Sequence, residues 1–277
     1  MLRAFVVRRD GGALSAFAVR GLGVLLLVFA VLVLAGCAEE TSSRESSTSY
    51  APTELRVAVA ANFAEAFDEL GARFAASEGG VPVSASVGST GSLAAQIVAG
   101  APFDVLLAAD ATRPALLEEQ GHIVPGSRFT YARGRLALTG ALLSEVPDGP
   151  TALRDARVRH VALANPATAP YGEAARTALA QLSLDVLLAP KLVLGNDVGQ
   201  AMQFVDAGAA ELGFVALSQL AVRADLPRWI VPETLHDPIL QDAALVRESE
   251  AARRLLAFLR SSEAGEVLMR FGYGASE

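Results

Sequence analysis

The stretch VGSTGSLAAQIVAGAPFDV, from Val87 to Val105, connects two predicted strands through a turn and a helix. It begins with glycine, serine and threonine and then becomes periodic in apolar residues, which is typical of a turn that opens a helix. The turn carries no charged side chain. Two explanations fit: an ordinary turn with an N-cap, or an anion cradle formed by the unpaired N–H groups and the positive dipole end of a helix start.

The same alternation of strand and helix continues on both sides of this stretch. Upstream and downstream, the pattern predicts strands at 55–59, 81–87 and 103–110, and helices at 63–74, 93–99 and 112–121. After Gly134 the pattern restarts, with strands at 135–140, 160–166, 191–195, 211–217 and 239–246 and helices at 172–182, 197–208 and 217–224. One or two closing helices are predicted within 250–272. This order predicts an α/β protein with doubly wound sheets and right-handed crossovers.

The two halves of the pattern predict two lobes, because no linker of distinct composition separates them. We expect the chain to cross between the lobes near 133–135 and near 238–241. Lobe 1 would then comprise 54–134 and 240–277, and lobe 2 would comprise 135–239.

The first 36 residues are predicted to be a signal peptide. Four arginines precede the apolar run GLGVLLLVFAVLVLAGC, which is shorter than the roughly 20 residues of a membrane-spanning helix. Small residues before Cys37 are the pattern of a bacterial lipoprotein signal, with Cys37 as the acylated N-terminus. The alternative is an uncleaved anchor with a chance cysteine. Residues 37–53 are polar, rich in serine and threonine and without periodicity, and we expect them to form a flexible tether.

Composition excludes several classes of function. Cys37 is the single cysteine, so the domain has no internal disulfide, thiolate metal site or cysteine nucleophile. The net charge of the whole chain is −7. The part after residue 36 holds 19 basic and 29 acidic residues, a net charge of −10. That charge disfavours nucleic acid or an anionic membrane surface as a partner.

Four strand-to-helix turns carry small, uncharged or capping residues, and they are the candidate site. They are Ala61-Asn62, Ser89-Thr90-Gly91-Ser92, Ala169-Pro170-Tyr171-Gly172 and Asn196-Asp197-Val198-Gly199. Such turns lie at the carboxyl ends of the strands, where ligands bind in open α/β sheets. Four helix starts from two facing lobes can therefore point at one anion, with the hydroxyls and the Asn62 amide as neutral donors.

Each turn also has a purely structural explanation. Asn62, Thr90 and Asp197 can be N-caps, which contribute about 1 kcal/mol each. Gly91 can relax a turn, and Tyr171 can be an aromatic residue at the rim. The functional hypothesis therefore depends on the four turns together.

Five segments, taken in order, resemble the periplasmic molybdate-binding proteins of ABC transporters. They are VAVAANFAEAFDELGARF, GSTGSLAAQIVAGAPFDVLLAADATRP, PGSRFTYARGRLAL, NPATAPYGEAA and NDVGQAMQFVDAGAAELGFVALSQL, and the likeness runs from Glu54 to the end of the chain. The resemblance implies the two-lobed fold of type II periplasmic binding proteins. It also implies a molybdate or tungstate ligand held in the cleft by hydroxyls and main-chain N–H groups.

Carried over by position, the resemblance implies a set of ligand-binding residues. Asn62 supplies the first-turn donor, the Ser89-Thr90 pair supplies the second with Thr90 in direct contact, and Tyr171 and Val198 bind through N–H groups. Ala61 stands where close relatives can have a hydroxyl residue. Ala216 stands where some members have a tyrosine, a role that the Tyr171 hydroxyl can take.

The resemblance further implies a monomeric receptor without cofactor or resident metal. It would be lipid-anchored in the periplasm or on the outer face of the cytoplasmic membrane and would deliver its ligand to the permease of an ABC importer. Three alternatives stay open: a receptor for another anion such as sulfate, phosphate or an organic acid, an enzyme, and an adhesive lipoprotein. An organic acid usually requires an arginine clamp, which the four turns lack. The histidines are scattered, and the chain has neither a G-x-S-x-G elbow nor a Walker A lysine, so we predict that it is not an enzyme.

Overall fold

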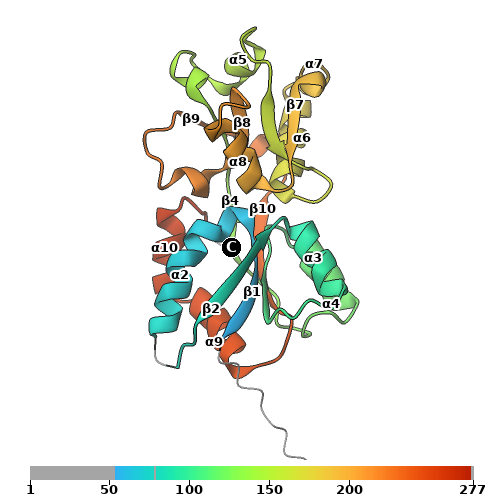
Figure 1. Cartoon of the computed structure of the whole chain (residues 1–277), viewed down its shortest axis with the longest axis vertical. Coiled ribbons are helices and arrows are strands. Elements are labelled where there is room, and N and C mark those ends of the chain that lie inside the picture. The colour runs from blue at the N-terminus through green and yellow to red at the C-terminus, as the bar shows by residue number, and fades with distance from the viewer. Residues whose placement is uncertain (1–53, 78, 276–277) are drawn as a thin grey trace, which may run out of the picture. The chain divides into compact units, whose positions relative to one another are not determined.

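The computed structural model describes residues 54–77 and 79–275, which form two mixed five-stranded sheets with helices on their faces (Figure 1). The prediction of an α/β fold with doubly wound sheets is confirmed. The predicted signal peptide, Cys37 and the tether lie outside the described residues. Within the described part of the chain, no helix combines the length and the apolar character needed to cross a membrane.

The first sheet has the strand order β2-β1-β3-β10-β4. Its strands are β1 (Leu55–Ala60), β2 (Val83–Gly88), β3 (Val105–Leu107), β4 (Phe129–Gly134) and β10 (Ile239–Leu245). β1 pairs in parallel with β2 and β3, whereas β10 runs antiparallel to β3 and β4. The sheet is flanked by η1 (Ala61–Phe63), α2 (Ala64–Ala76), α3 (Thr90–Val98), α4 (Thr112–Glu119), α9 (Glu250–Leu259) and α10 (Ser262–Arg270). We call this sheet and these helices lobe 1.

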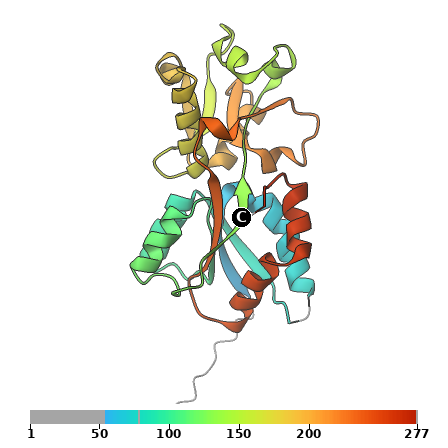
Figure 2. The same cartoon turned by 180° about the vertical axis from the view of Figure 1, so that it is seen from behind.

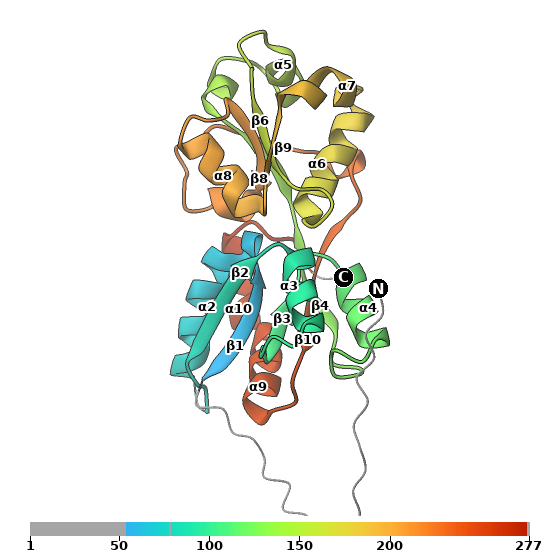
Figure 3. The same ribbon diagram turned by 45° about the vertical axis from the view of Figure 1, so that its right-hand side comes forward.

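Both faces of the first sheet are buried, as expected for parallel strands. Leu55, Val57 and Val59 of β1 pack with α2, α9 and α10 on one face. Ala58 packs with Leu106 and with α3 and α4 on the other. Figures 1 and 3 show α2 on one side of the sheet and α3 and α4 on the opposite side.

The second sheet repeats this arrangement in the order β7-β6-β8-β5-β9. Its strands are β5 (Leu136–Thr139), β6 (Val161–Ala164), β7 (Leu192–Gly195), β8 (Leu212–Ala216) and β9 (Arg228–Ile230). β6 is parallel to β7 and β8, and β5 is antiparallel to β8 and β9. Around it lie η2 (Ala141–Ser144), α5 (Gly149–Arg154), α6 (Pro170–Gln181), α7 (Asp185–Leu188), η3 (Ala189–Lys191), α8 (Val198–Asp206), η4 (Leu217–Leu220) and η5 (Glu233–Leu235). We call this sheet and these helices lobe 2.

Two segments join the sheets, one between β4 and β5 and one between β9 and β10, and both are visible from behind (Figure 2). The lobe boundaries predicted from the sequence remain our proposal. The sequence analysis did not predict β4, β9 or α5. The helix predicted at 217–224 is wrong, because only the short 3-10 helix η4 forms there. Beyond it, the Arg228 guanidinium donates to the carbonyl oxygens of Leu220 and Arg223 at 2.9 and 2.7 Å, which fixes a turn instead.

Candidate functional site

The four predicted turns meet around one small cavity. It is partly open to solvent. The turns after β1 and β2 in lobe 1 and those before α6 and α8 in lobe 2 form its wall. All six residues that the sequence analysis placed at the site line it, namely Ala61, Asn62, Ser89, Thr90, Tyr171 and Val198.

Four helix starts lie at the cavity wall. η1 begins at Ala61, α3 at Thr90, α6 at Pro170 and α8 at Val198. The first N–H groups of a helix have no partner within that helix, so each start offers donors and a positive dipole end. Pro170 has no N–H, and the first main-chain donor of α6 is therefore that of Tyr171.

The wall is almost free of charge. Among the lining residues only Asp197 is ionisable below the tyrosine range. The Asp197 carboxylate accepts the Gln200 N–H at 3.0 Å and is the N-cap of α8, so the capping explanation holds for this residue. Among the described residues, neither a lysine nor an arginine lines the cavity. Any anion held here must therefore be held by neutral hydrogen-bond donors.

The Thr90 hydroxyl can donate a hydrogen bond to a ligand. The Thr90 side chain is fully buried, and its Oγ1 accepts the N–H of Ala109 at 2.9 Å. Because a hydroxyl has one proton and two lone pairs, this bond leaves the proton available for a ligand. The capping role falls to Ser89 instead, since Ser89 is the N-cap of α3 and its Oγ accepts the Ser92 N–H.

The Asn62 side-chain amide, expected to be a neutral donor to the ligand, is hydrogen-bonded within the protein. Asn62 is buried, and its Nδ2 donates to Gln241 Oε1 at 2.8 Å and to the Tyr273 hydroxyl at 3.0 Å. A buried amide must be satisfied, and these two bonds use both of its protons. The donor that Asn62 can offer to the cavity is its main-chain N–H, near the start of η1.

The Tyr171 hydroxyl is buried and has no hydrogen-bond partner among the described residues. It lies against the Cα of Gly134, where a Cβ would collide with it. Burial raises the pKa of Tyr171 well above its usual range. The hydroxyl is therefore neutral at physiological pH and has an unused proton.

The lobes contact each other beside the cavity. The Gly91 N–H of α3 donates to the Thr168 carbonyl oxygen of lobe 2 at 2.9 Å, and the Arg113 guanidinium donates to Ala167 O at 3.2 Å. A Cβ on Gly91 would lie 2.8 Å from Thr168 O. Gly91 does not have a positive φ. Its lack of a side chain therefore serves the close approach of the lobes, which the sequence analysis did not predict.

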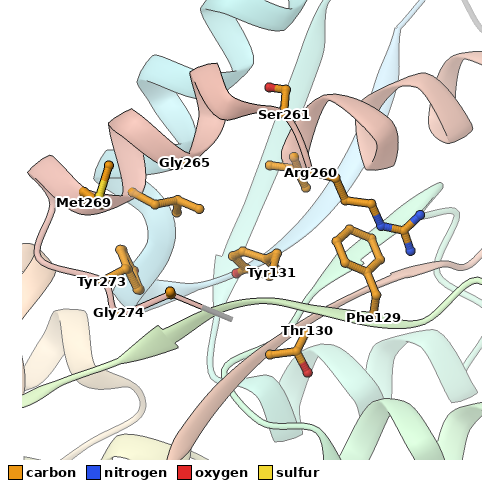
Figure 4. Close-up of a pocket in the computed structure, with 12 residues that line it drawn as sticks. Phe129, Thr130, Tyr131, Arg260, Ser261, Gly265, Met269, Tyr273 and Gly274 are labelled. Atoms are coloured by element: carbon orange, nitrogen blue, oxygen red, sulfur yellow. The ribbon is translucent and has the colours of Figure 1, made fainter. Parts of the chain in front are cut away.

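A larger cavity lies in lobe 1, between β4, α10 and the segment around Gly274 (Figure 4). Two residues that line this cavity stack on each other: Arg260 Cζ lies 3.7 Å from the centroid of the Phe129 ring. None of the six predicted site residues lines it. Within the described ranges, no cluster of three or more His, Cys, Asp or Glu side chains could hold a metal ion.

Sequence reasoning missed Ala109, whose N–H orients the Thr90 hydroxyl, and also Gln241 and Tyr273, which hold Asn62. Ala109 follows a buried strand, as the other turns do, so its position at a strand end was a usable signal. Gln241 and Tyr273 lie 179 and 211 residues from Asn62 and gave no local signal.

Two α/β lobes around a cavity built from helix starts define a two-lobed solute-binding protein. The family described as bacterial extracellular solute-binding protein matches residues 55–274, and the chain belongs to it. The chain is 44% identical over 227 residues to the molybdate-binding protein ModA of Azotobacter vinelandii, covering 80% of this chain and 90% of that protein. It is 43% identical to the ModA of Rhodobacter capsulatus, covering 79% and 88%.

The structure is also similar to that of the periplasmic molybdate-binding protein of Azotobacter vinelandii. The TM-score is 0.76 at 36% identity, and the match covers 80% of this chain and all of the other. The predicted family and its two-lobed fold are confirmed. Because the family consists of solute-binding proteins, the prediction that the chain is not an enzyme is confirmed too.

Proposed function

We propose that this protein captures molybdate, or tungstate, in the cavity between its lobes and delivers it to the permease of an ABC importer. The observation that carries the proposal is the cavity wall, in which four helix starts meet without a lysine or arginine. A tetrahedral dianion has only acceptor oxygens, and this wall offers neutral donors. The relatives of 43–44% identity are named for molybdate binding.

Each proposed contact uses a donor that the protein itself leaves unused. Thr90 donates its hydroxyl proton, while Asn62, Tyr171 and Val198 donate main-chain N–H groups at helix starts. The Tyr171 hydroxyl supplies a further neutral donor. Ser89 and Ala61 line the wall and shape it. Because sulfate would use the same donors, we propose that cavity size decides between sulfate and the larger oxyanions.

We further propose that the protein is a monomer held at the membrane by acylation of Cys37. The polar segment 37–53 would let the binding domain reach a permease while anchored. The protein would then work in the periplasm or on the outer face of the cytoplasmic membrane. Mass spectrometry of the protein purified from membranes tests the acylation, because a mature chain that begins at an unmodified residue other than Cys37 contradicts it.

Isothermal titration calorimetry with molybdate, tungstate, sulfate and phosphate tests the ligand. We expect one-to-one binding of molybdate and tungstate at micromolar affinity or tighter, and none of sulfate. Phosphate carries a proton that a wall of donors cannot accept, so it should also fail to bind. Binding of sulfate without binding of molybdate or tungstate would refute the ligand assignment in favour of a sulfate receptor.

A further inference from the structure

Each sheet has a third strand end near the cavity, and neither of these two turns was assigned to the ligand. In lobe 1 the turn follows β3, and there the Ala109 N–H holds the Thr90 hydroxyl oxygen. In lobe 2 the turn follows β8 and forms η4, which contains Ser218 and Gln219. The two sheets have corresponding strand orders, so these turns occupy corresponding places.

Gln219 joins η4 to the Val198 turn. Its Nε2 donates to Val198 O at 3.3 Å, and its Oε1 accepts the Ala216 N–H at 3.0 Å. Gln219 is buried, so both ends of its amide are used inside the protein. These bonds fix η4 relative to the start of α8 within lobe 2.

Ser218, the preceding residue, reaches the other lobe. Its Oγ donates to the main-chain carbonyl oxygen of Asn62 at 2.7 Å, and both residues are buried. The Tyr273 hydroxyl of lobe 1 donates to the same oxygen at 2.8 Å. The Asn62 carbonyl is therefore bonded once within its own lobe and once from lobe 2. Neither Ser218 nor Gln219 lines the cavity.

We propose that Ser218 is a positioning residue that bonds the Asn62 turn to lobe 2 when the lobes close, and so slows the release of the ligand. The inference rests on the proposed function for its readout. Opening the cleft separates Ser218 from Asn62 and exposes their bond, whereas the Tyr273 bond stays within lobe 1. Only the closed form holds the Ser218 bond. The closed, ligand-bound protein must therefore break this hydrogen bond before it can open and release the ligand.

The test is Ser218→Ala in the full chain, with molybdate as ligand. Loss of one buried hydrogen bond should raise Kd on the order of 3- to 10-fold, chiefly through faster dissociation in stopped-flow chase experiments. The melting temperature of the ligand-free protein should stay the same, because Asn62 O keeps its bond from Tyr273. Ser218→Thr retains the hydroxyl and should restore slow dissociation.

Ser144→Ala is the matched control. Like Ser218, Ser144 lies in a 3-10 helix of lobe 2, and its Oγ donates to a carbonyl oxygen at 2.7 Å, but that carbonyl belongs to Ala141 of the same helix. Ser144→Ala should leave the dissociation rate of molybdate unchanged. A dissociation rate for Ser218→Ala within twofold of wild type overturns the inference, as does an equal fall of melting temperature with and without ligand. Wild-type protein that binds no molybdate refutes the proposed function instead.

Discussion

Replacing Gly91 by alanine should weaken ligand binding without destabilising the ligand-free protein. Gly91 lies in the first turn of α3, at the point where its N–H donates to Thr168 O of lobe 2. A Cβ there would lie 2.8 Å from that oxygen and 3.0 Å from Thr168 Cα, whereas ordinary contacts begin at 3.4 Å. The lobes would have to separate locally by about 0.6 Å, the difference between 2.8 and 3.4 Å.

The size of the effect follows from the bonds that this separation strains. The bond from Gly91 to Thr168 contributes about 0.5–1.5 kcal/mol, and lengthening the ligand's own hydrogen bonds adds a similar amount. Together these losses are about 1–3 kcal/mol, which corresponds to a roughly 5- to 150-fold increase in Kd. The same substitution should stabilise the helix α3, because alanine favours a helix over glycine by up to about 1 kcal/mol.

Two measurements separate these effects. Calorimetric titration with molybdate gives Kd, and thermal unfolding without ligand gives the stability of the protein. The control is Gly265→Ala in α10, a glycine whose Cβ would meet no atom within 4 Å. It should leave Kd unchanged. Wild-type affinity in Gly91→Ala, or an equal loss of affinity in the control, would refute the argument that Gly91 permits the lobes to close.

The remaining predictions concern single side chains at or near the cavity. Thr90→Val, which keeps the shape but loses the hydroxyl, should raise the Kd for molybdate by roughly 10- to 100-fold in calorimetry, with Thr90→Ser as the control. Tyr171→Phe should leave the melting temperature of the ligand-free protein unchanged or higher, because the hydroxyl has no partner, and a fall would contradict this. Burial raises the pKa of Glu65 above 4.5 despite the attraction of Arg223. The folded state therefore binds the proton of the Glu65 carboxyl group more tightly than the unfolded state does. As pH rises from 4.5 through the raised pKa, wild type should lose stability relative to Glu65→Gln. Thermal unfolding across that window measures the difference. Affinity for molybdate should change by less than about twofold when sodium chloride is raised through the physiological range, because no cation lines the site.

The sequence predicted the parts of the site that depend on local patterns. Small polar residues and glycine between an apolar strand and a periodic helix indicate a helix start, so the sequence predicts the turns around Thr90 and Val198. Both turns line the cavity. The strand-and-helix alternation likewise predicted the two α/β sheets, since parallel strands need crossover helices.

Long-range partners account for what the sequence did not predict. The sequence analysis took the Asn62 amide as a donor for the ligand, because its partners Gln241 and Tyr273 lie far along the chain. The sequence analysis interpreted Gly91 as a turn residue, because its contact with Thr168 of the other lobe has no local sequence signal. The helix predicted from 217 stopped early because Arg228 satisfies the carbonyls that the helix would have used. In each case a contact between distant segments outweighed the local pattern.

The arrangement explains how a net acidic protein can be suited to an anion. Arg113 lies beside Gly91, but its guanidinium is paired with the Asp110 carboxylate at 2.7 Å and does not line the cavity. Because no lysine or arginine of the described ranges lines the wall, attraction must come from short-range donors that act only when the lobes meet. Affinity then depends on closure geometry, to which Gly91 and Ser218 contribute without touching the ligand. Residues that set the fit between the lobes therefore contribute to binding alongside the donors themselves.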